Sequence, residues 1–170
     1  YLAGLIADEK LMTKSDLQNW VENAYWYMLS DFTVPWVAAE SKYGMELALE
    51  WIDSDTELIC SAGWATLSNL AAYLPDEELN LPKFAELLDY VGQNIHKAPN
   101  RVIYSMNNFL ISVGYYIESL RAKSLEISDR IGKVSVDMGD TSCKVPTATE
   151  YINKSVARSP IIKKKKTVRC

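Results

Sequence analysis

Histidine and cysteine are scarce in this chain of 170 residues, which has one His and three Cys. The common zinc sites need four closely spaced ligands, so this scarcity argues against a metal centre, and we expect no cofactor. The cysteines (Cys60, Cys143 and Cys170) are odd in number and widely scattered. This arrangement favours a reduced, cytoplasmic protein over a disulfide-bonded secreted one.

Glycine, proline and long hydrophobic runs are also in short supply. Seven Gly and six Pro are too few for a loop-rich all-β chain. The longest uncharged run, 58–75, contains several hydroxyl and amide side chains and is better explained as a buried helix than as a membrane span. The apolar start, 1–7, lacks the basic segment of a signal peptide. Because the chain starts without Met and apparently inside a helix, we interpret it as lacking N-terminal helices.

Familiar catalytic motifs are missing as well. The sequence contains no GxGxxG, GxxxxGK[ST], HExxH, GxSxG or CxxC pattern. The single histidine, His96, precedes Pro99 at an expected helix end and is interpreted as a surface residue rather than a base. Cys60 lies among apolar residues and is interpreted as a core thiol.

Acidic and basic residues are unevenly distributed along the chain. Residues 1–130 contain 9 Lys or Arg and 19 Asp or Glu, whereas residues 131–170 contain 9 and 3. Much of the positive charge lies in Lys163, Lys164, Lys165 and Lys166. A basic tail on an acidic body is typical of a mobile, solvated terminus or of a contact with a polyanion.

Helical periodicity dominates the rest of the sequence and predicts an all-α fold. The expected helices begin near Thr13 or Ser15 and cover 25–41, 44–52, 55–73, 82–96, 99–119, 120–131 and 147–157. Pro35 should either kink the helix over 25–41 or start its second half. Gly132 should end one of them, and residues 133–146 should form an irregular excursion. We therefore expect one helical-repeat domain over 1–157 and a basic, mobile tail over 158–170.

A weak internal repeat relates two of these helices. Residues 57–67 align with 101–111 at an offset of 44, which matches Ile59 with Ile103 and Leu67 with Ile111. A period of about 40–47 residues is typical of HEAT-type helical solenoids. Chance similarity between two amphipathic helices is the alternative explanation, and both explanations give an all-α fold.

The densest aromatic stretch surrounds a single acid. Between Glu22 and Glu40, Asp31 is the only charged residue, and Trp26, Tyr27 and Phe32 lie close to it in the sequence. An aromatic run of this kind is usually part of a core, and a lone acid in it is usually a surface or hydrogen-bonded residue. A functional site is the alternative.

Several segments together resemble one known family. They are 26–35, Trp51-Ile-Asp-Ser-Asp55, 107–114 and the end of the chain, with its Gly132–Pro146 segment and lysine-rich, Cys-terminated tail. In this order and at these spacings they resemble the bacterial DNA alkylation repair proteins, the AlkD-type alkylpurine DNA glycosylases. The resemblance covers almost the whole chain and about the later two-thirds of the family domain. It implies a right-handed α-α superhelix of HEAT-like repeats.

The resemblance also implies an activity. Such glycosylases hydrolyse the N-glycosidic bond of N3- and N7-alkylpurines in double-stranded DNA without flipping the base. A cationic alkylpurine is a good leaving group, so catalysis depends on a carboxylate that stabilises the developing sugar cation and on aromatic faces beside the deoxyribose. The expected partner is alkylated double-stranded DNA, bound by a monomer without a membrane or cofactor.

The family's site residues transfer to this chain only in part. Aligning on Val34-Pro35 places the catalytic acid at Asp31, whereas aligning on Trp26 places it at Ser30; Asp31 is the only carboxylate available, with Trp26 or Tyr27 beside it. The family's phosphate-binding Arg falls at Ser61 and its second Trp at Asn108, although Trp64 or Tyr104 offers a replacement ring. The expected DNA-binding residues are Arg101, Arg121, Lys123, Lys163, Lys164, Lys165 and Lys166.

These two substitutions keep a second hypothesis open. In it, the chain is a non-catalytic helical-repeat module that binds nucleic acid or a protein on its concave face. The first hypothesis predicts that Asp31 and an aromatic ring lie on that face with an open, positively charged approach.

Overall fold

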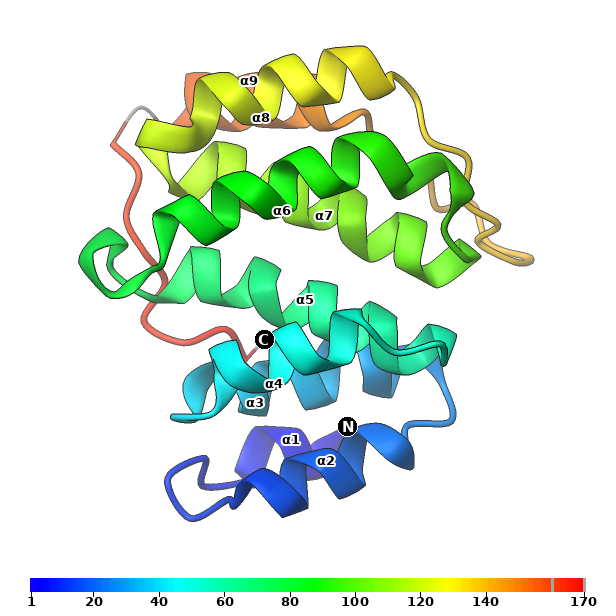
Figure 1. The fold of residues 1–170 in the computed structure, drawn as a ribbon, viewed down its shortest axis with the longest axis vertical. Coiled ribbons are helices and arrows are strands. Elements are labelled where there is room, and N and C mark those ends of the chain that lie inside the picture. Colours follow the sequence, from blue (N-terminus) through cyan, green and yellow to red (C-terminus); the bar gives the residue numbers. More distant parts are fainter. Residues whose placement is uncertain (160, 170) are drawn as a thin grey trace.

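Two layers of helices make up the described part of the protein (Figure 1). The computed structural model describes residues 1–159 and 161–169, and it places no strand in these ranges. The front layer contains α2 (Lys14–Glu22), α4 (Gly44–Ile52), α6 (Leu81–Asn94) and α8 (Glu118–Ile131). The rear layer contains α1 (Leu2–Ile6), α3 (Val34–Glu40), α5 (Glu57–Tyr73), α7 (Asn100–Tyr116) and α9 (Ala148–Arg158). The predicted all-α fold is confirmed.

Local signals in the sequence fix several helix ends. Thr13 caps α2 by accepting from the Asp16 amide, and the Asp16 carboxylate accepts from the Thr13 amide. Asn80 caps α6 in the same way, through the amide of Lys83. The helix α4 has the predicted bounds, and Gly132 ends α8 with a φ of +68°, a conformation that glycine adopts without strain.

The predicted helix over 25–41 is interrupted, and of the two roles expected for Pro35 the structure shows the start of the second half. The chain turns after Ala24, forms a short π-helical turn η1 (Leu29–Thr33), and only then enters α3. In η1 the amide of Val34 donates to the carbonyl of Leu29, and the Thr33 hydroxyl donates to the carbonyl of Met28 at 3.1 Å. Pro35, which lacks an amide hydrogen, lies in the first turn of α3. Such widened turns are frequent at functional sites.

The internal repeat is confirmed by direct contacts between equivalent residues. The Arg101 amide donates to the Glu57 carboxylate at 2.7 Å, and the hydroxyls of Ser61 and Ser105 lie 3.2 Å apart. Each pair is separated by 44 residues, so α5 and α7 run side by side in the same direction. Gly63 allows α4 to approach α5, because a Cβ there would lie 2.7 Å from the amide nitrogen of Ile52.

Aromatic side chains form much of the core between the two layers. Trp64, Phe84 and Phe109 are fully buried, and the rings of Trp64 and Phe109 meet edge to face with centroids 5.3 Å apart. A second cluster, which includes Leu17, Val37 and Trp51, joins α2 to α3 and α4. No helix among the described residues is long and apolar enough to cross a membrane.

The described part of the tail, 161–169, lies against the body instead of extending into solvent. The Lys165 amide donates to the carbonyl of Ala72 at 2.8 Å, near the end of α5. The Arg169 guanidinium lies 2.5 Å from Glu9 and 2.8 Å from Glu40. Acidic side chains and helix carbonyls of the body thus hold Lys164 and Arg169 of the tail, and its mobility stays a prediction.

Candidate nucleic-acid interface

Asp31 lies in a closed polar cluster where η1 meets α5 and α7. Its carboxylate accepts from the hydroxyls of Ser30 at 3.0 Å and Ser61 at 2.6 Å. Arg101 donates to the other carboxylate oxygen from Nε at 2.9 Å and also from Nη2. Only 2% of the Asp31 side chain is exposed. The cluster therefore neutralises the charge of Asp31 and covers it.

Two tyrosine rings enclose the Arg101 guanidinium. Its central carbon lies 4.5 Å from the ring centroid of Tyr27 and 4.4 Å from that of Tyr104. Trp26 extends this row, since its ring meets Tyr27 edge to face at 5.3 Å while half of the side chain stays exposed. Stacking and ion pairing together hold the guanidinium in place.

The structure brings some of the sequence-predicted site residues together and separates others. Asp31 and Tyr27 both contact Arg101, but the open approach to Asp31 that catalysis requires is absent. Ser61 is fully buried in the same cluster, so this position faces Asp31 and not a phosphate. Trp64 is a core residue and offers no replacement ring at the surface.

A groove of about 880 Å³ lies beside this cluster on the rear layer. Its floor is one face of α7, where Tyr104, Asn108, Ile111 and Tyr115 follow one another at helical spacing. Its walls come from α9, from the 133–146 segment and from the tail. They contribute Tyr151, Arg158, Met138, Cys143, Lys144, Pro146 and Lys165. Asn108, where the family resemblance expects a Trp, thus lies in the floor of this groove.

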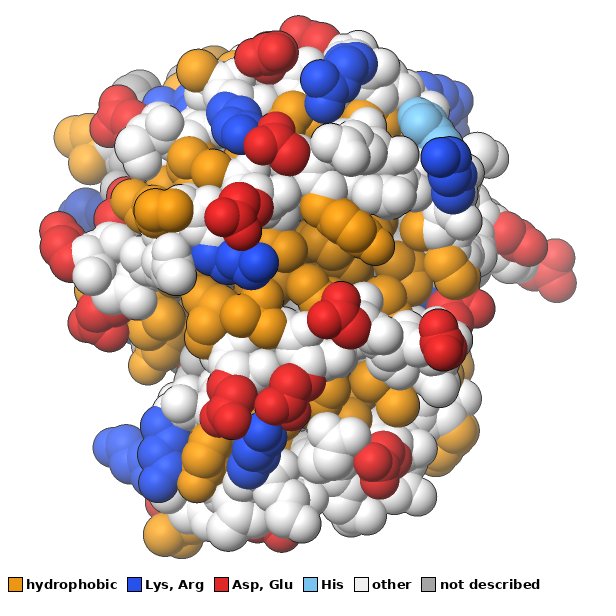
Figure 2. Space-filling model, in the orientation of Figure 1, with side chains coloured by type: hydrophobic (Ala, Val, Ile, Leu, Met, Phe, Trp, Pro, Cys, Tyr) orange, Lys and Arg blue, Asp and Glu red, His pale blue; other side chains and the backbone are white. Residues whose placement is uncertain are grey.

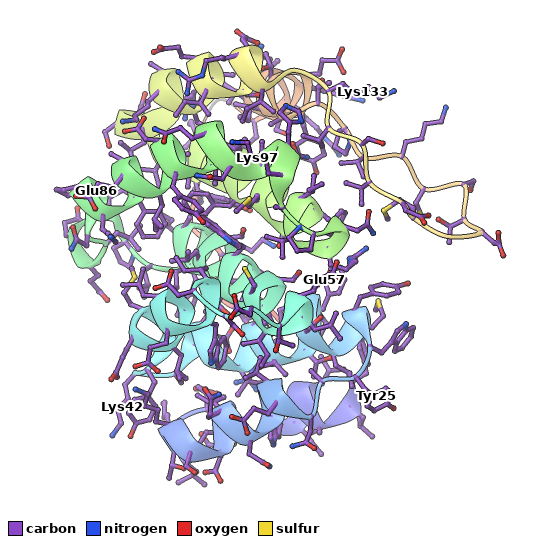
Figure 3. The ribbon with its side chains drawn as sticks, turned by 45° about the vertical axis from the view of Figure 1, so that its right-hand side comes forward. Tyr25, Lys42, Glu57, Glu86, Lys97 and Lys133 are labelled. Carbon is purple, nitrogen blue, oxygen red and sulfur yellow. The ribbon has the colours of Figure 1, made fainter. Side chains whose placement is uncertain are left out.

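The 133–146 segment is held against α7 at both ends. The Asn100 side chain exchanges two hydrogen bonds with the backbone of Asp137, at 2.8 and 2.7 Å, and Asn107 donates to the carbonyl of Pro146 at 3.1 Å. Between these points the segment projects from the body, on the same side as the exposed ring of Tyr25 (Figure 3). The structure places no helix or strand within 133–146.

Charge sets this groove apart from the opposite face. On the front layer, acidic and basic side chains are interspersed, with apolar side chains between α4 and α6 (Figure 2). The groove is lined by Lys144, Arg158 and Lys165 and by no Asp or Glu. These three cations form no ion pair with another described residue. The lining therefore offers free positive charge in an otherwise acidic body.

Other cations expected to bind DNA are occupied within the protein. Arg121 donates to the carbonyl of Gly114 at 3.0 Å, and Lys123 pairs with Asp89 at 2.6 Å. Lys164 pairs with Asp76 at 2.8 Å. Lys163, Lys165 and Lys166 are exposed. Their role in DNA binding remains a prediction.

Sequence reasoning missed the groove residues Tyr115, Tyr151, Lys144 and Arg158. The spacing of Tyr104, Asn108 and Tyr115 on one helix face was an available signal, but the partner surfaces come from residues more than 20 positions later. Burial raises the pKa of Tyr116, which also lines the groove, and the neighbouring Tyr115 and Tyr151 raise it further. Its phenol is therefore a hydrogen-bond donor at neutral pH.

Among residues 1–159 and 161–169, no group of three or more His, Cys, Asp or Glu side chains is placed to hold a metal ion. The chemistry on offer is tyrosine rings, hydroxyls, one amide and cations. Aromatic rings and cations are also the groups that proteins combine to bind single-stranded nucleic acids.

Comparison with known proteins gives relatives along almost the whole chain, although no family model matches it. The chain is 32% identical over 161 residues to the uncharacterized protein Lmo0209 of Listeria monocytogenes, covering 94% of this chain and 68% of that protein. It is 32% identical over 157 residues to the uncharacterized protein Lin0241 of Listeria innocua, covering 91% and 66%. The chain thus spans about two thirds of the length of these relatives.

A solved structure extends the comparison to the fold. It represents a new family of proteins related to the HEAT-like repeat DNA glycosylases, with affinity for branched DNA structures. Its TM-score is 0.91 at 37% sequence identity, and the match covers 100% of this chain and 72% of that one. The predicted HEAT-like repeat architecture is confirmed. The chain belongs to this family of proteins related to the HEAT-like repeat DNA glycosylases.

Proposed function

We propose that the protein binds branched DNA along its rear layer and does not excise bases. The observation that carries this proposal is the groove, whose described lining holds no acid and three cations that pair with no other described residue. Such a lining is exceptional in a chain whose first 130 residues contain 19 acids and 9 bases. Phosphate contacts by Lys and Arg provide most of the affinity of proteins for DNA. The branched-DNA affinity of the related structure supports the same partner.

The closed cluster around Asp31 supports binding without excision. A carboxylate lowers the barrier to sugar-cation formation when it lies beside the sugar with its charge available. The Asp31 charge is paired with Arg101 and is also hydrogen-bonded by two serines. In this arrangement Asp31 positions the Arg101 guanidinium between two rings instead of acting on DNA. The catalytic roles predicted for Asp31, Trp26 and Tyr27 would require this cluster to open.

Excision of alkylpurines is the second candidate function. One observation favours it: the acid that the family resemblance singles out and an aromatic residue at the surface, Tyr27, both contact the Arg101 side chain. Excision would require Arg101 to leave Asp31 and a sugar to take its place. The alkylated duplex and the monomeric state belong to this candidate as predictions.

Competition binding tests the proposal. The protein is first mixed with a fluorescein-labelled three-way junction. Unlabelled junction, or linear duplex of the same arm sequence, is then added as competitor. The junction should compete at lower concentration, and the apparent affinity should fall steeply with salt because counterions are released. Equal competition by the linear duplex would contradict a preference for branched DNA. No binding at low salt would contradict the proposal as a whole.

A further inference from the structure

The groove on the rear layer has the size and lining of a site for unpaired nucleotides. Its volume of about 880 Å³ lies within the range of pockets that enclose drug-sized ligands, and it is far too small to admit a double helix. Tyrosines 104, 115, 116 and 151 line it together with Phe32. An aromatic ring offers a stacking surface to any base whose own face is free.

The position of the charges matches the backbone of a short single strand. Lys144 comes from the projecting segment, Arg158 from the end of α9 and Lys165 from the tail. Each of the three residues is exposed. Tyrosine rings therefore make up the floor and part of one wall, while the cations come from three separate segments around them. This distribution complements a strand whose bases lie inward and whose phosphates lie outward.

A duplex is a poor occupant of such a lining. Paired bases are already stacked on their neighbours, so their faces are not available to tyrosine rings. A branch point is a place where bases can be left unpaired between arms. An acidic peptide is the competing occupant, since it would also meet the three cations, but it would make no use of the rings.

We infer that the groove binds one or two unpaired nucleotides, stacking their bases on Tyr115 and Tyr151 with Lys144 and Arg158 at the phosphates. The inference rests on the proposed function and specifies which part of a branched DNA this site holds. Arg101 takes no part in this contact, because its guanidinium is already paired with Asp31 and lies between the rings of Tyr27 and Tyr104.

Fluorescence of 2-aminopurine tests the inference on the full chain. One probe places 2-aminopurine in an unpaired position of a three-way junction, and a second places it inside a paired arm. Stacking on a tyrosine should quench the unpaired probe on binding and leave the paired probe unchanged. Equal responses of the two probes would overturn the inference.

Ring-removal variants provide the matched controls. Tyr115→Ala and Tyr151→Ala should each weaken binding of a short oligo(dT) by about 5-fold to 100-fold, the range found when a stacked ring is removed. Tyr115→Phe and Tyr151→Phe keep the ring and should keep most of that affinity. Tyr90→Ala removes a half-exposed ring from the front layer and should leave it unchanged. Circular dichroism confirms that each variant is folded.

The outcomes separate this inference from the proposed function. Junction binding that survives Tyr115→Ala and Tyr151→Ala without loss, with no quenching of the unpaired probe, overturns the inference and leaves branched-DNA binding intact. Loss of all junction binding by the wild-type protein overturns the proposed function itself. A last competition uses poly-glutamate at the same concentration of negative charges as the oligo(dT). If it displaces oligo(dT) equally well from the wild type and from the tyrosine variants, the groove binds acidic polymers and the inference is overturned.

Discussion

The Asp31 cluster and the groove lie next to each other on the rear layer, and they treat charge in opposite ways. In the cluster, one acid and one guanidinium neutralise each other, and 2% and 12% of their side chains are exposed. In the groove, three cations are exposed, and no other described residue forms an ion pair with them. Tyr104 belongs to both regions, since it covers Arg101 and lines the groove.

This difference separates side chains that hold the fold together from side chains that are available to a ligand, in two adjacent regions. Ionised groups taken out of water must be paired, so the cluster contributes to the fold and is costly to disrupt. Exposed cations contribute little to the fold and remain available to a ligand. We therefore expect substitutions in the two regions to act on different measurements.

Breaking the cluster should have the largest effect. Arg101→Ala leaves the Asp31 carboxylate buried without its ion-pair partner, which should lower the free energy of unfolding by about 3–5 kcal/mol. Urea unfolding followed by circular dichroism measures this loss. Lys97→Ala, which removes a cation just before α7, is the control and should change stability by no more than about 0.5 kcal/mol.

A double variant sharpens this test. Combining Asp31→Asn with Arg101→Met removes both charges, so it should cost less than Arg101→Ala alone despite changing two residues. A double variant that is less stable than the single one would show that the pair is not the source of the effect.

Releasing the tail should have a smaller effect on stability. Arg169 donates to the carbonyl of Ala7 at 2.5 Å and pairs with Glu9 and Glu40, so it joins the first helices to the end of α3. Arg169→Ala should lower the free energy of unfolding by about 1–3 kcal/mol because these partly buried partners lose a charged donor. Lys166→Ala in the same tail should leave stability unchanged, and equal losses in the two variants would contradict the bridging role.

Removing groove cations should change DNA binding and leave stability almost untouched. Lys144→Ala and Arg158→Ala together should reduce the slope of log affinity against log salt by about 2, roughly one for each lost phosphate contact. The thermal midpoint should stay within the range of ordinary surface substitutions. Lys154→Ala, on α9 but outside the groove lining, is the control; an equal loss of slope there would assign the effect to net charge.

The smallest expected effect concerns the two placed cysteines. Burial raises the pKa of Cys60 to about 11, to which the charge of Asp53 adds, while Cys143 is exposed on the projecting segment. In a Cys170→Ser background at pH 8, iodoacetamide should therefore label Cys143 much faster than Cys60, because the thiolate reacts. Rapid double labelling of the native protein would contradict this.

The raised pKa of Cys60 also predicts that the free energy of unfolding falls at high pH. The Cys60 thiol ionises near its ordinary value of 9.0 when unfolded and near 11 when folded. Its contribution to stability is therefore complete below about pH 9 and is lost as the pH rises to about 11. Cys60→Ser, followed by urea unfolding at pH 8 and pH 10.5, should show a weaker fall than wild type.

Local rules were sufficient to predict most helices but not the functional geometry. Capping by Thr13, the stop at Gly132 and the 44-residue repeat depend on residues close in sequence or on a single period. The Asp31 cluster joins residues 30 and 70 positions apart, and no spacing in the sequence indicates that Arg101 would meet Asp31. The contacts of the tail could not be predicted for the same reason, because its partners lie more than 90 residues away.

The family resemblance singled out Asp31 and Ser61, and the structure places their side chains in contact. The catalytic role of Asp31 stays a prediction. Arg101 reaches the Asp31 carboxylate from the next repeat, and Ser61 donates to the same carboxylate. A long-range contact of this kind becomes visible only when the helices are placed in space.

Release of 7-methylguanine tests the central claim most directly. A single preparation that binds the three-way junction is incubated with methylated duplex DNA, and the free base is measured alongside Asp31→Asn. Because Arg101 and two serines already engage the Asp31 carboxylate, we predict junction binding and no release above the uncatalysed background, with Asp31→Asn affecting stability only. Release by the wild-type protein that Asp31→Asn reduces by about 10²–10³-fold would contradict the account and restore Asp31 as a catalytic residue.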